Sequence, residues 1–217
     1  MFDLSAVWRS NGGSKMKKVI ALMLALITLI SLAGCSKGSD DEAKAPYGMK
    51  LASGKESEFY LYIPDSWINT TPVYTDKKIP SITVSARVSD SDPSNISLVG
   101  FVDGNREYDS IEDYWEHTKS VSKYFDDVKD EESGETKSSF ELITKAKAMT
   151  MGNLAAKKYE YTGTVAGSEF KFMQVIAKDK DVFYTFTYTS TPDIYSKNES
   201  AVETILKNIK FKNVDKK

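Results

Sequence analysis

Few side chains in this sequence have the types and spacing that catalysis or metal binding requires. His117 is the only histidine, and hydrolytic triads and most zinc sites need a histidine with partners. Cys35 is the only cysteine, so the chain can form neither an internal disulfide nor a cluster of thiolate metal ligands. Without a second histidine or cysteine, we expect His117 to lie on a solvent-facing helix surface and not in a catalytic site.

One short acidic pattern invites comparison with a calcium loop. Asp90-x-Asp92-x-Ser94 has oxygen-bearing residues at alternate positions. However, the sixth position is Asn95 where a glycine is needed, and the twelfth is Phe101 where a bidentate glutamate belongs. We therefore predict a loop without a bound ion.

Two other patterns give similarly weak indications of metal binding or catalysis. The acidic cluster from Asp126 to Glu132 is dense enough for a weak divalent ion, but a run of charges usually forms a solvated surface, and the sequence leaves this question open. Ser120-x-x-Lys123 matches the first element of serine penicillin-binding enzymes, but the Ser-Asp-Asn and Lys-Thr-Gly companions are absent from the sequence. Phosphate-binding loops and dinucleotide fingerprints are absent as well. We predict no catalytic residue, no metal ligand and no cofactor.

The twelve tyrosines have two interpretations. Half of them fall on expected strands, where tyrosine readily fills half-buried sheet positions. Alternatively, some line a groove for a glycan, peptide or protein, because tyrosine combines apolar area with a hydrogen-bonding tip. Packing is the simpler explanation, and we predict it for the tyrosines on strands: Tyr60, Tyr62, Tyr159, Tyr161, Tyr184 and Tyr188.

Cys35 ends a segment that is built like an export signal. A positive start at Met16-Lys17-Lys18 precedes the apolar residues 19–32, and small residues follow. The segment closes with Leu32, Ala33, Gly34 and Cys35. This ending resembles the lipobox of bacterial lipoproteins, in which the cysteine thiol is alkylated with diacylglycerol and the chain is cleaved before that cysteine. The resemblance implies an exported protein that is anchored to a bacterial cell membrane through Cys35.

An uncleaved membrane anchor is the alternative. Residues 19–33 are shorter than the roughly 20 residues that a spanning helix needs, which argues against it. Residues 1–15 precede a signal that is already complete, so we interpret them as a surplus extension and hypothesise that translation begins at Met16.

Composition indicates how the chain after the predicted signal peptide is organised. Removing the signal peptide (1–34) leaves 183 residues, enough for one domain with a core. Their net charge is −5, and their lysines are interleaved with acids, so nucleic-acid binding is excluded. We expect a polar, flexible tether over 35–46, one domain over 47–211 and a polar tail over 212–217.

Alternating apolar residues predict the first strands of that domain. A hairpin is expected over 47–53 and 58–63, and Trp67 behind it should close one edge of the core. Strands over 79–88 and 96–102 should flank a loop over 89–95.

Helical spacing of apolar residues predicts a helix over 111–125, followed by a charged loop over 126–138. Two shorter strand-like runs follow, at 140–144 and 146–151.

The second half has the clearest pattern. Runs over 155–165, 168–178 and 182–190 predict an antiparallel meander, whose last strand carries apolar residues on both faces. A closing helix is expected from a capping box at Ser196 and Glu199, with an apolar stripe. The stripe consists of Val202, Ile205, Leu206 and Ile209.

The order of these segments resembles the PsbP-like family, named for an extrinsic subunit of photosystem II. Four segments carry the resemblance: residues 59–67, the helix at 111–125, Tyr159-Glu160-Tyr161, and residues 202–211. It implies an α+β fold in which an antiparallel β-sheet has helices packed on its faces, an α/β/α sandwich. None of the plant protein's metal-binding or photosystem-docking residues can be matched to a position here.

These patterns lead to one functional expectation with two alternatives. We expect a non-enzymatic, lipid-anchored extracytoplasmic accessory or binding protein, with a protein or glycan partner at the cell envelope. The first alternative is a carboxylate-dependent envelope hydrolase, which would place paired carboxylates across one cleft. The second is a structural spacer of the envelope, which would be flat and have no pocket.

Overall fold

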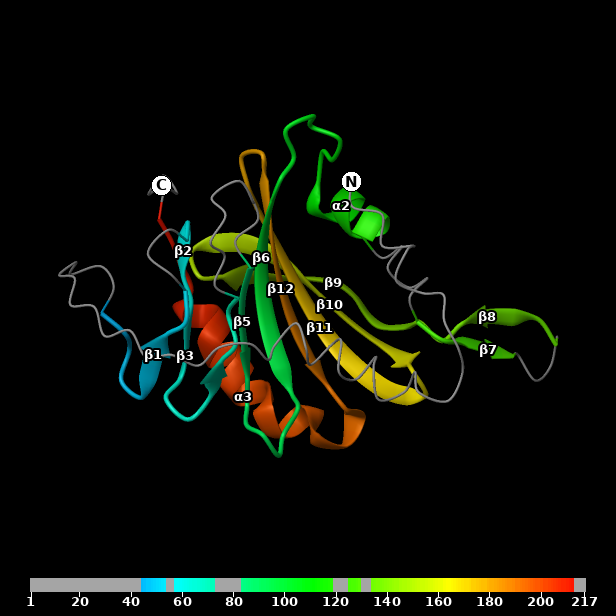
Figure 1. Cartoon of the computed structure of the whole chain (residues 1–217). Coiled ribbons are helices and arrows are strands. Elements are labelled where there is room, and N and C mark those ends of the chain that lie inside the picture. Colours follow the sequence, from blue (N-terminus) through cyan, green and yellow to red (C-terminus); the bar gives the residue numbers. More distant parts are fainter. Residues whose placement is uncertain (1–43, 54–56, 73–82, 119–124, 130–133, 213–217) are drawn as a thin grey trace.

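The computed structural model describes residues 44–53, 57–72, 83–118, 125–129 and 134–212 (Figure 1). Most of these residues belong to a seven-stranded antiparallel sheet in the order β4-β5-β6-β12-β11-β10-β9. The strands of this sheet are β4 (Ile68–Asn69), β5 (Thr83–Arg87), β6 (Asn95–Val102), β9 (Glu141–Met151), β10 (Leu154–Val165), β11 (Ser168–Asp179) and β12 (Val182–Ser190).

The strands β10 to β12 form the predicted three-stranded meander, and β9 extends it by one strand beside β10. The turn between β10 and β11 consists of Ala166 and Gly167, both in left-handed backbone, as a two-residue type I′ turn requires. The predicted strands over 155–165, 168–178 and 182–190 are therefore confirmed to within a residue at each end. The runs at 140–144 and 146–151 form one strand, β9.

Alternation along β12 divides the interior into two hydrophobic cores. Tyr184, Phe186 and Tyr188 belong to the larger core, whereas Phe183, directly before them, belongs to a second core on the opposite face. Helix α3 (Pro192–Asn208) covers the larger core, and the predicted apolar stripe from Val202 to Ile209 is buried there. Burying each such side chain stabilises the fold by about 1.5–3 kcal/mol.

Two short ribbons contribute to the larger core beside α3. β1 (Met49–Leu51) pairs with β3 (Tyr62–Pro64), which confirms the predicted hairpin. β2 (Phe59–Tyr60) instead pairs with β13 (Lys210–Phe211) near the end of the chain. Trp67 is buried in this core, as expected.

Helix α2 (Ile111–Thr118) covers part of the second face (Figure 1). Trp115 stacks on Tyr159 with ring centroids 4.2 Å apart, and Tyr114 stacks on Phe183 at 4.3 Å. Helices thus lie on both faces of an antiparallel sheet, which confirms the predicted α+β sandwich.

The predicted first helix is confirmed over 111–118 and wrong at its last residue. We expected one helix over 111–125; residues 111–118 form α2, residues 119–124 lie outside the described residues, and Phe125 is not helical. The ring of Phe125 packs on the sheet beside Phe172, at 5.5 Å, directly over Gly163. A Cβ at Gly163 would lie 2.7 Å from that ring, so the missing side chain makes the close contact possible.

The predicted start of the last helix was also wrong. The helix begins at Pro192 after Thr191, four residues before the expected capping box at Ser196 and Glu199. Proline favours the first helical position because its fixed φ suits the helix and its missing N–H would have had no partner there. The acidic side chain of Asp193 adds a favourable charge in the first turn.

The predicted charged loop over 126–138 needs correction as well. Its described residues include a small antiparallel ribbon of β7 (Asp127–Lys129) and β8 (Thr136–Ser138). Nearly all of its side chains are exposed, so it lacks the apolar alternation by which sequence patterns reveal strands.

The two strands predicted before α2 are present. β6 confirms the predicted strand over 96–102, and β5 confirms the described part of the predicted strand over 79–88.

Candidate functional site

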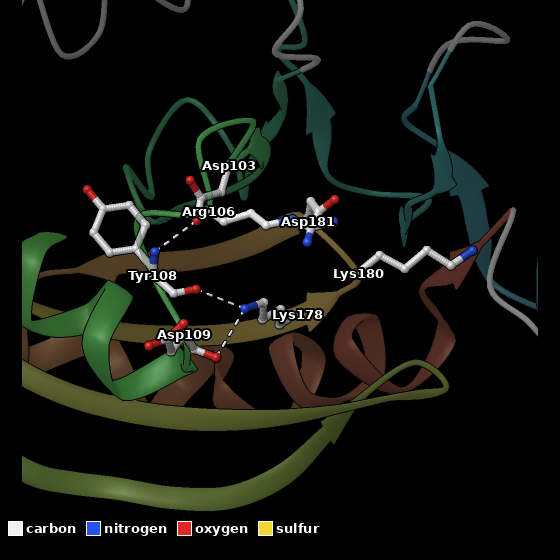
Figure 2. Close-up of a pocket in the computed structure, with 7 residues that line it drawn as sticks. All are labelled: Asp103, Arg106, Tyr108, Asp109, Lys178, Lys180 and Asp181. Atoms are coloured by element: carbon white, nitrogen blue, oxygen red, sulfur yellow. Dashed lines mark hydrogen bonds and ion pairs between the residues drawn. The ribbon is translucent and has the colours of Figure 1, made fainter.

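A cavity of about 470 Å³ lies at one end of the sheet, between the loop that follows β6 and the turn between β11 and β12 (Figure 2). Its lining is almost entirely charged. The lining residues are Asp103, Arg106, Tyr108, Asp109, Lys178, Lys180 and Asp181.

Asp103 fixes the loop after β6. It is only 3% exposed, and its two carboxylate oxygens accept the backbone N–H groups of Glu107, at 2.9 Å, and Tyr108, at 3.0 Å. Its own backbone N–H donates to the carbonyl of Asp181 at 2.7 Å, which joins this loop to the β11–β12 turn. The Asp103 carboxylate therefore acts as a structural anchor of the cavity wall.

Two lining residues have left-handed backbone, which is uncommon for residues other than glycine. Arg106 has φ of 55° and Lys180 has φ of 53°. Lys180 is the first residue of the two-residue β11–β12 turn, where a tight hairpin requires positive φ, whereas Arg106 lies in the loop that Asp103 anchors. The Arg106 guanidinium lies beside Asp181, with Nε 3.4 Å from Oδ1 (Figure 2).

Lys178 connects the cavity to the start of α2. Its ammonium group donates to the backbone carbonyls of Tyr108, at 2.9 Å, and Asp109, at 3.1 Å (Figure 2). The same group lies 4.9 Å above the ring of Phe183. Lys178 thus holds the cavity wall against the second core.

Exposed apolar side chains flank the cavity. Phe101 and Val102, at the end of β6, are 41% and 55% exposed. The Phe101 ring stacks on buried Tyr114 at 5.7 Å, so its orientation is fixed although its outer face is open. The same ring lies 6.4 Å from that of Tyr108, which lines the cavity together with Arg106. Aromatic residues and arginine are enriched at protein-binding surfaces.

The cavity's chemistry favours binding over acid–base catalysis. Of its three carboxylates, Asp103 is occupied by backbone N–H groups and Asp181 pairs with Arg106. A glycosidase-type pair would instead need two carboxyl groups facing each other across the cleft. Within the described part of the chain, no group of three His, Cys, Asp or Glu residues is placed to hold a metal ion.

The residues that the sequence singled out for possible chemistry have other roles. His117 is exposed on α2, as predicted, with its ring 5.1 Å from that of Tyr108. Asp92, in the calcium-like loop, is buried and accepts the amide of Asn198 on α3 at 2.9 Å. Asp126 accepts the backbone N–H of Gly167 at 2.7 Å and so closes the β10–β11 turn.

Several predictions fall outside the described residues. These are the signal peptide with the lipobox residues Leu32, Ala33, Gly34 and Cys35, most of the tether and of the polar tail, the Ser120/Lys123 pair, and the acidic residues at 130–132. Among the described residues, no helix has the length and apolar character needed to cross a membrane.

Most of the strand tyrosines pack in the interior, as predicted. Tyr60 is half-buried, and the other five are buried: Tyr62, Tyr159, Tyr161, Tyr184 and Tyr188. None of them lines the cavity at the sheet end, whose one tyrosine is Tyr108.

Sequence reasoning missed the residues of this cavity. Two signals could have indicated them: the turn-forming residues Gly104 and Asn105 after a buried strand, and Arg106 as one of only two arginines beyond the predicted signal peptide. Neither signal points to Asp181, which joins the site only through the pairing of β6 with β12.

Comparison with solved structures identifies a similar fold. The solution structure of cyanobacterial PsbP (CyanoP) from Synechocystis sp. PCC 6803 matches with a TM-score of 0.50 and 14% identity, over 83% of this chain and 98% of that one. At this identity the match establishes likeness of fold alone, and it supports the predicted PsbP-like architecture.

Weaker matches include a Pseudomonas aeruginosa protein of unknown function, with a TM-score of 0.44 and 19% identity over 74% of this chain and 94% of that one. LpqN of Mycobacterium tuberculosis, described as involved in cell envelope biogenesis, matches with a TM-score of 0.45 and 12% identity, over 70% of this chain and 82% of that one. No protein-family model and no curated protein sequence matches the chain.

Proposed function

We propose that this protein is a lipid-anchored extracytoplasmic accessory protein that binds a protein partner through the end of its sheet and has no enzymatic activity. The observation that carries the binding role is the charged cavity with the fixed, partly exposed ring of Phe101 at its edge, where that ring lies 6.4 Å from Tyr108 of the cavity lining and 5.7 Å from Tyr114. The location rests on the export signal and on the Leu-Ala-Gly-Cys ending at Cys35.

The surface has the composition of a small interface. Aromatic residues and arginine are enriched at binding hot spots because they combine large contact areas with directional hydrogen bonds. Phe101 is already held by Tyr114, and the loop that carries Arg106 is held by Asp103, so binding would order few side chains. A smaller loss of conformational entropy leaves more of the contact energy for affinity.

The two alternatives fit this geometry less well. An envelope hydrolase would need a free carboxyl pair, whereas Asp103 and Asp181 already have partners. A passive spacer gives no reason for a charged cavity with Arg106 held in left-handed backbone in its wall.

Site-specific crosslinking tests the binding surface. A photoreactive phenylalanine analogue at position 101, where it keeps the aromatic ring, is expected to crosslink one partner in cells of the source organism, whereas the same group at the exposed position 128 on β7 should not. Arg106→Ala should reduce the yield at position 101 several-fold, with Leu142→Ala as the control on an exposed strand position. Equal yields at positions 101 and 128, or no effect of Arg106→Ala, would contradict the proposed surface.

The anchor needs a separate experiment. Cys35→Ala is expected to release the protein from membranes while the domain stays folded, and Ser36→Ala should leave it attached. Mass spectrometry of the product distinguishes loss of lipid from retention of an uncleaved signal. Continued membrane attachment of a cleaved Cys35→Ala protein would refute lipidation at Cys35.

A further inference from the structure

A second cavity lies on the opposite face of the sheet from α2, between α3 and the strands β9 to β11. It has a volume of about 500 Å³, within the range of small-molecule sites. Its charged residues are Lys147 on β9, Lys158 on β10, and Glu203 and Lys207 on α3. We call it the lysine groove.

Two of these lysines oppose each other directly. Lys147 and Lys158 are paired in register across β9 and β10, so both side chains project from the same face of the sheet. Like charges at directly opposed positions destabilise a sheet. A locally unfavourable pair that the rest of the fold maintains is a typical mark of a functional site.

The carboxylates nearby balance only part of the lysine charge: Lys147, Lys158 and Lys207 stand against Glu203 and Glu160, which leaves an excess of one positive charge. Lys158 pairs with Glu160 at 3.2 Å, and Glu160 also accepts the hydroxyl of Tyr195. Burial alone would raise the pKa of Glu160, but the positive charges of Lys158 and Lys171 outweigh this and lower it, so Glu160 is ionised at neutral pH. Neither Lys147 nor Lys207 forms an ion pair with another described residue.

Apart from Thr150, the rest of the groove is apolar. Its apolar residues are the half-buried Met149 and, beneath it in the core, Met173 and Leu206, which are each 1% exposed. Methionine is flexible and polarisable, so it adapts to the shape of an alkyl chain. The groove therefore combines cationic side chains with a hydrophobic wall.

We propose that the lysine groove binds a small monomeric amphiphile with a phosphate monoester head and an alkyl or acyl tail. The head would lie among Lys147, Lys158 and Lys207, and the tail would lie on the half-buried Met149, above the buried Met173 and Leu206. A phosphate monoester carries a charge of about −1.5 to −2 at neutral pH and so matches several lysines better than a carboxylate does. This site is independent of the partner-binding surface at the sheet end.

Calorimetric titration of the purified full chain with octyl phosphate, below its micellar concentration, tests the proposal. Binding is expected, and Lys147→Met together with Lys207→Met should weaken it at least tenfold. Lys145→Met is the matched control, because Lys145 is an exposed lysine on the same strand that does not line the groove. Glu203→Gln should strengthen binding, since it removes the negative charge that lines the groove.

Three further ligands separate the proposal from its alternatives. Inorganic phosphate and octyltrimethylammonium should each bind at least tenfold more weakly than octyl phosphate, because one lacks the tail and the other has the wrong charge. Inorganic phosphate binding as tightly as octyl phosphate would overturn the role of the apolar wall. Binding to vesicles of anionic phospholipid without binding of monomeric octyl phosphate would instead indicate a membrane surface and overturn the proposal.

A stability measurement distinguishes a binding role from a structural one. If Lys147 and Lys158 repel each other, Lys147→Met should raise the thermal unfolding midpoint while it weakens ligand binding. A lower midpoint together with unchanged octyl phosphate affinity would assign Lys147 to structure and contradict the proposal.

Discussion

Asp92 shows how one buried carboxylate joins distant parts of the chain. Its oxygens accept the backbone N–H of Ser94 at 3.0 Å and the side-chain amide of Asn198 at 2.9 Å. Nearby, the hydroxyls of Ser94 and Ser190 share a buried hydrogen bond of 2.8 Å. This polar cluster holds the loop between β5 and β6 against the first half of α3.

Replacing Asp92 should therefore destabilise the protein. Asp92→Ala leaves two buried donors without their acceptor, and each such loss costs about 1–3 kcal/mol. We expect urea unfolding at neutral pH to show a decrease of that order in the free energy of unfolding. Asp65→Ala, at an exposed aspartate in a turn, should change it by less than about 0.5 kcal/mol. Equal effects of the two substitutions would contradict the anchoring role.

The contribution of Asp92 should depend on pH. Burial alone would raise the pKa of Asp92, but hydrogen bonds from Ser94 and Asn198 and the charge of Lys197 outweigh it, so the folded-state pKa lies below the ordinary value. The stabilisation is then present above about pH 4 and is lost as the pH falls through the folded-state pKa. The stability difference between the wild type and Asp92→Asn should accordingly shrink in acid, as measured by urea unfolding at several pH values.

Gly152, in the turn between β9 and β10, has the most restrictive surroundings among the described glycines. Its φ is +56°, and a Cβ there would lie 2.2 Å from the carbonyl oxygen of Ile209. Gly152→Ala should lower the free energy of unfolding by more than about 2 kcal/mol, because strain and a backbone clash add together. Gly167→Ala has the same kind of φ without a neighbouring atom, so it should cost only about 1 kcal/mol in the same urea experiment.

At the scale of elements, β9 is an edge strand of the main sheet. Its pairing with β10 contains irregularities between Lys158 and Tyr161, and most of its side chains are exposed. Bulges and lysines on edge strands prevent pairing with other chains. Leu142 and Ile143 are 37% and 52% exposed, so without these features the strand would tend to pair with other chains.

Removing one lysine from this edge tests its protective role. Lys145→Ile is expected to increase self-association at high protein concentration, measured by sedimentation velocity, because it extends the exposed apolar stretch of β9. Lys197→Ile, on the exposed surface of α3, should have little effect. Equal self-association of both variants would indicate general surface hydrophobicity as the cause.

The two helices differ in how they are held on the sheet. α3 is long and buries five of its residues, whereas α2 has eight residues and depends on Tyr114 and Trp115. An ion pair between Glu112 and Lys157 adds a contact between α2 and β10. Such short helices gain most of their stability from tertiary packing, so α2 depends on the aromatic cluster beneath it.

At the scale of the whole molecule, buried tyrosines should control stability in alkali. Burial raises the pKa of eight tyrosines in the described structure: Tyr62, Tyr108, Tyr114, Tyr159, Tyr161, Tyr184, Tyr188 and Tyr195. Burial and the neighbouring Glu58 carboxylate raise the pKa of Tyr184 to about 12. Above about pH 10 the unfolded chain therefore releases protons that the folded protein keeps, and stability falls.

The expected loss is about 1.4 kcal/mol per pH unit for each tyrosine that is ionised only in the unfolded chain. Urea unfolding between about pH 8 and pH 11, with tyrosinate absorbance as a second probe, measures it. Tyr184→Phe should reduce the slope, because one proton fewer is released on unfolding. A stability that stays constant above pH 10 would contradict the raised pKa values.

Several parts of this protein were predictable from sequence because they depend on local periodicity. Alternation of apolar residues indicated the strands β10 to β12, and apolar residues on both faces of β12 indicated that the sheet is covered on both sides. The lipobox and Cys35 are likewise a matter of local sequence, and they remain predictions from it. The start of α3 was less predictable, since Pro192 decided it, and Phe125 lies outside a helix, with its ring packed over Gly163.

The two cavities were decided by the tertiary structure alone. Asp103 meets Asp181 because β6 pairs with β12, and Lys147 faces Lys158 because of the register between β9 and β10, to which α3 adds Lys207. Periodicity indicates which face of a strand is buried, but it does not specify strand order or register. The sequence by itself determined the fold class, the buried faces and the export pattern, whereas strand pairing decided which charged side chains meet.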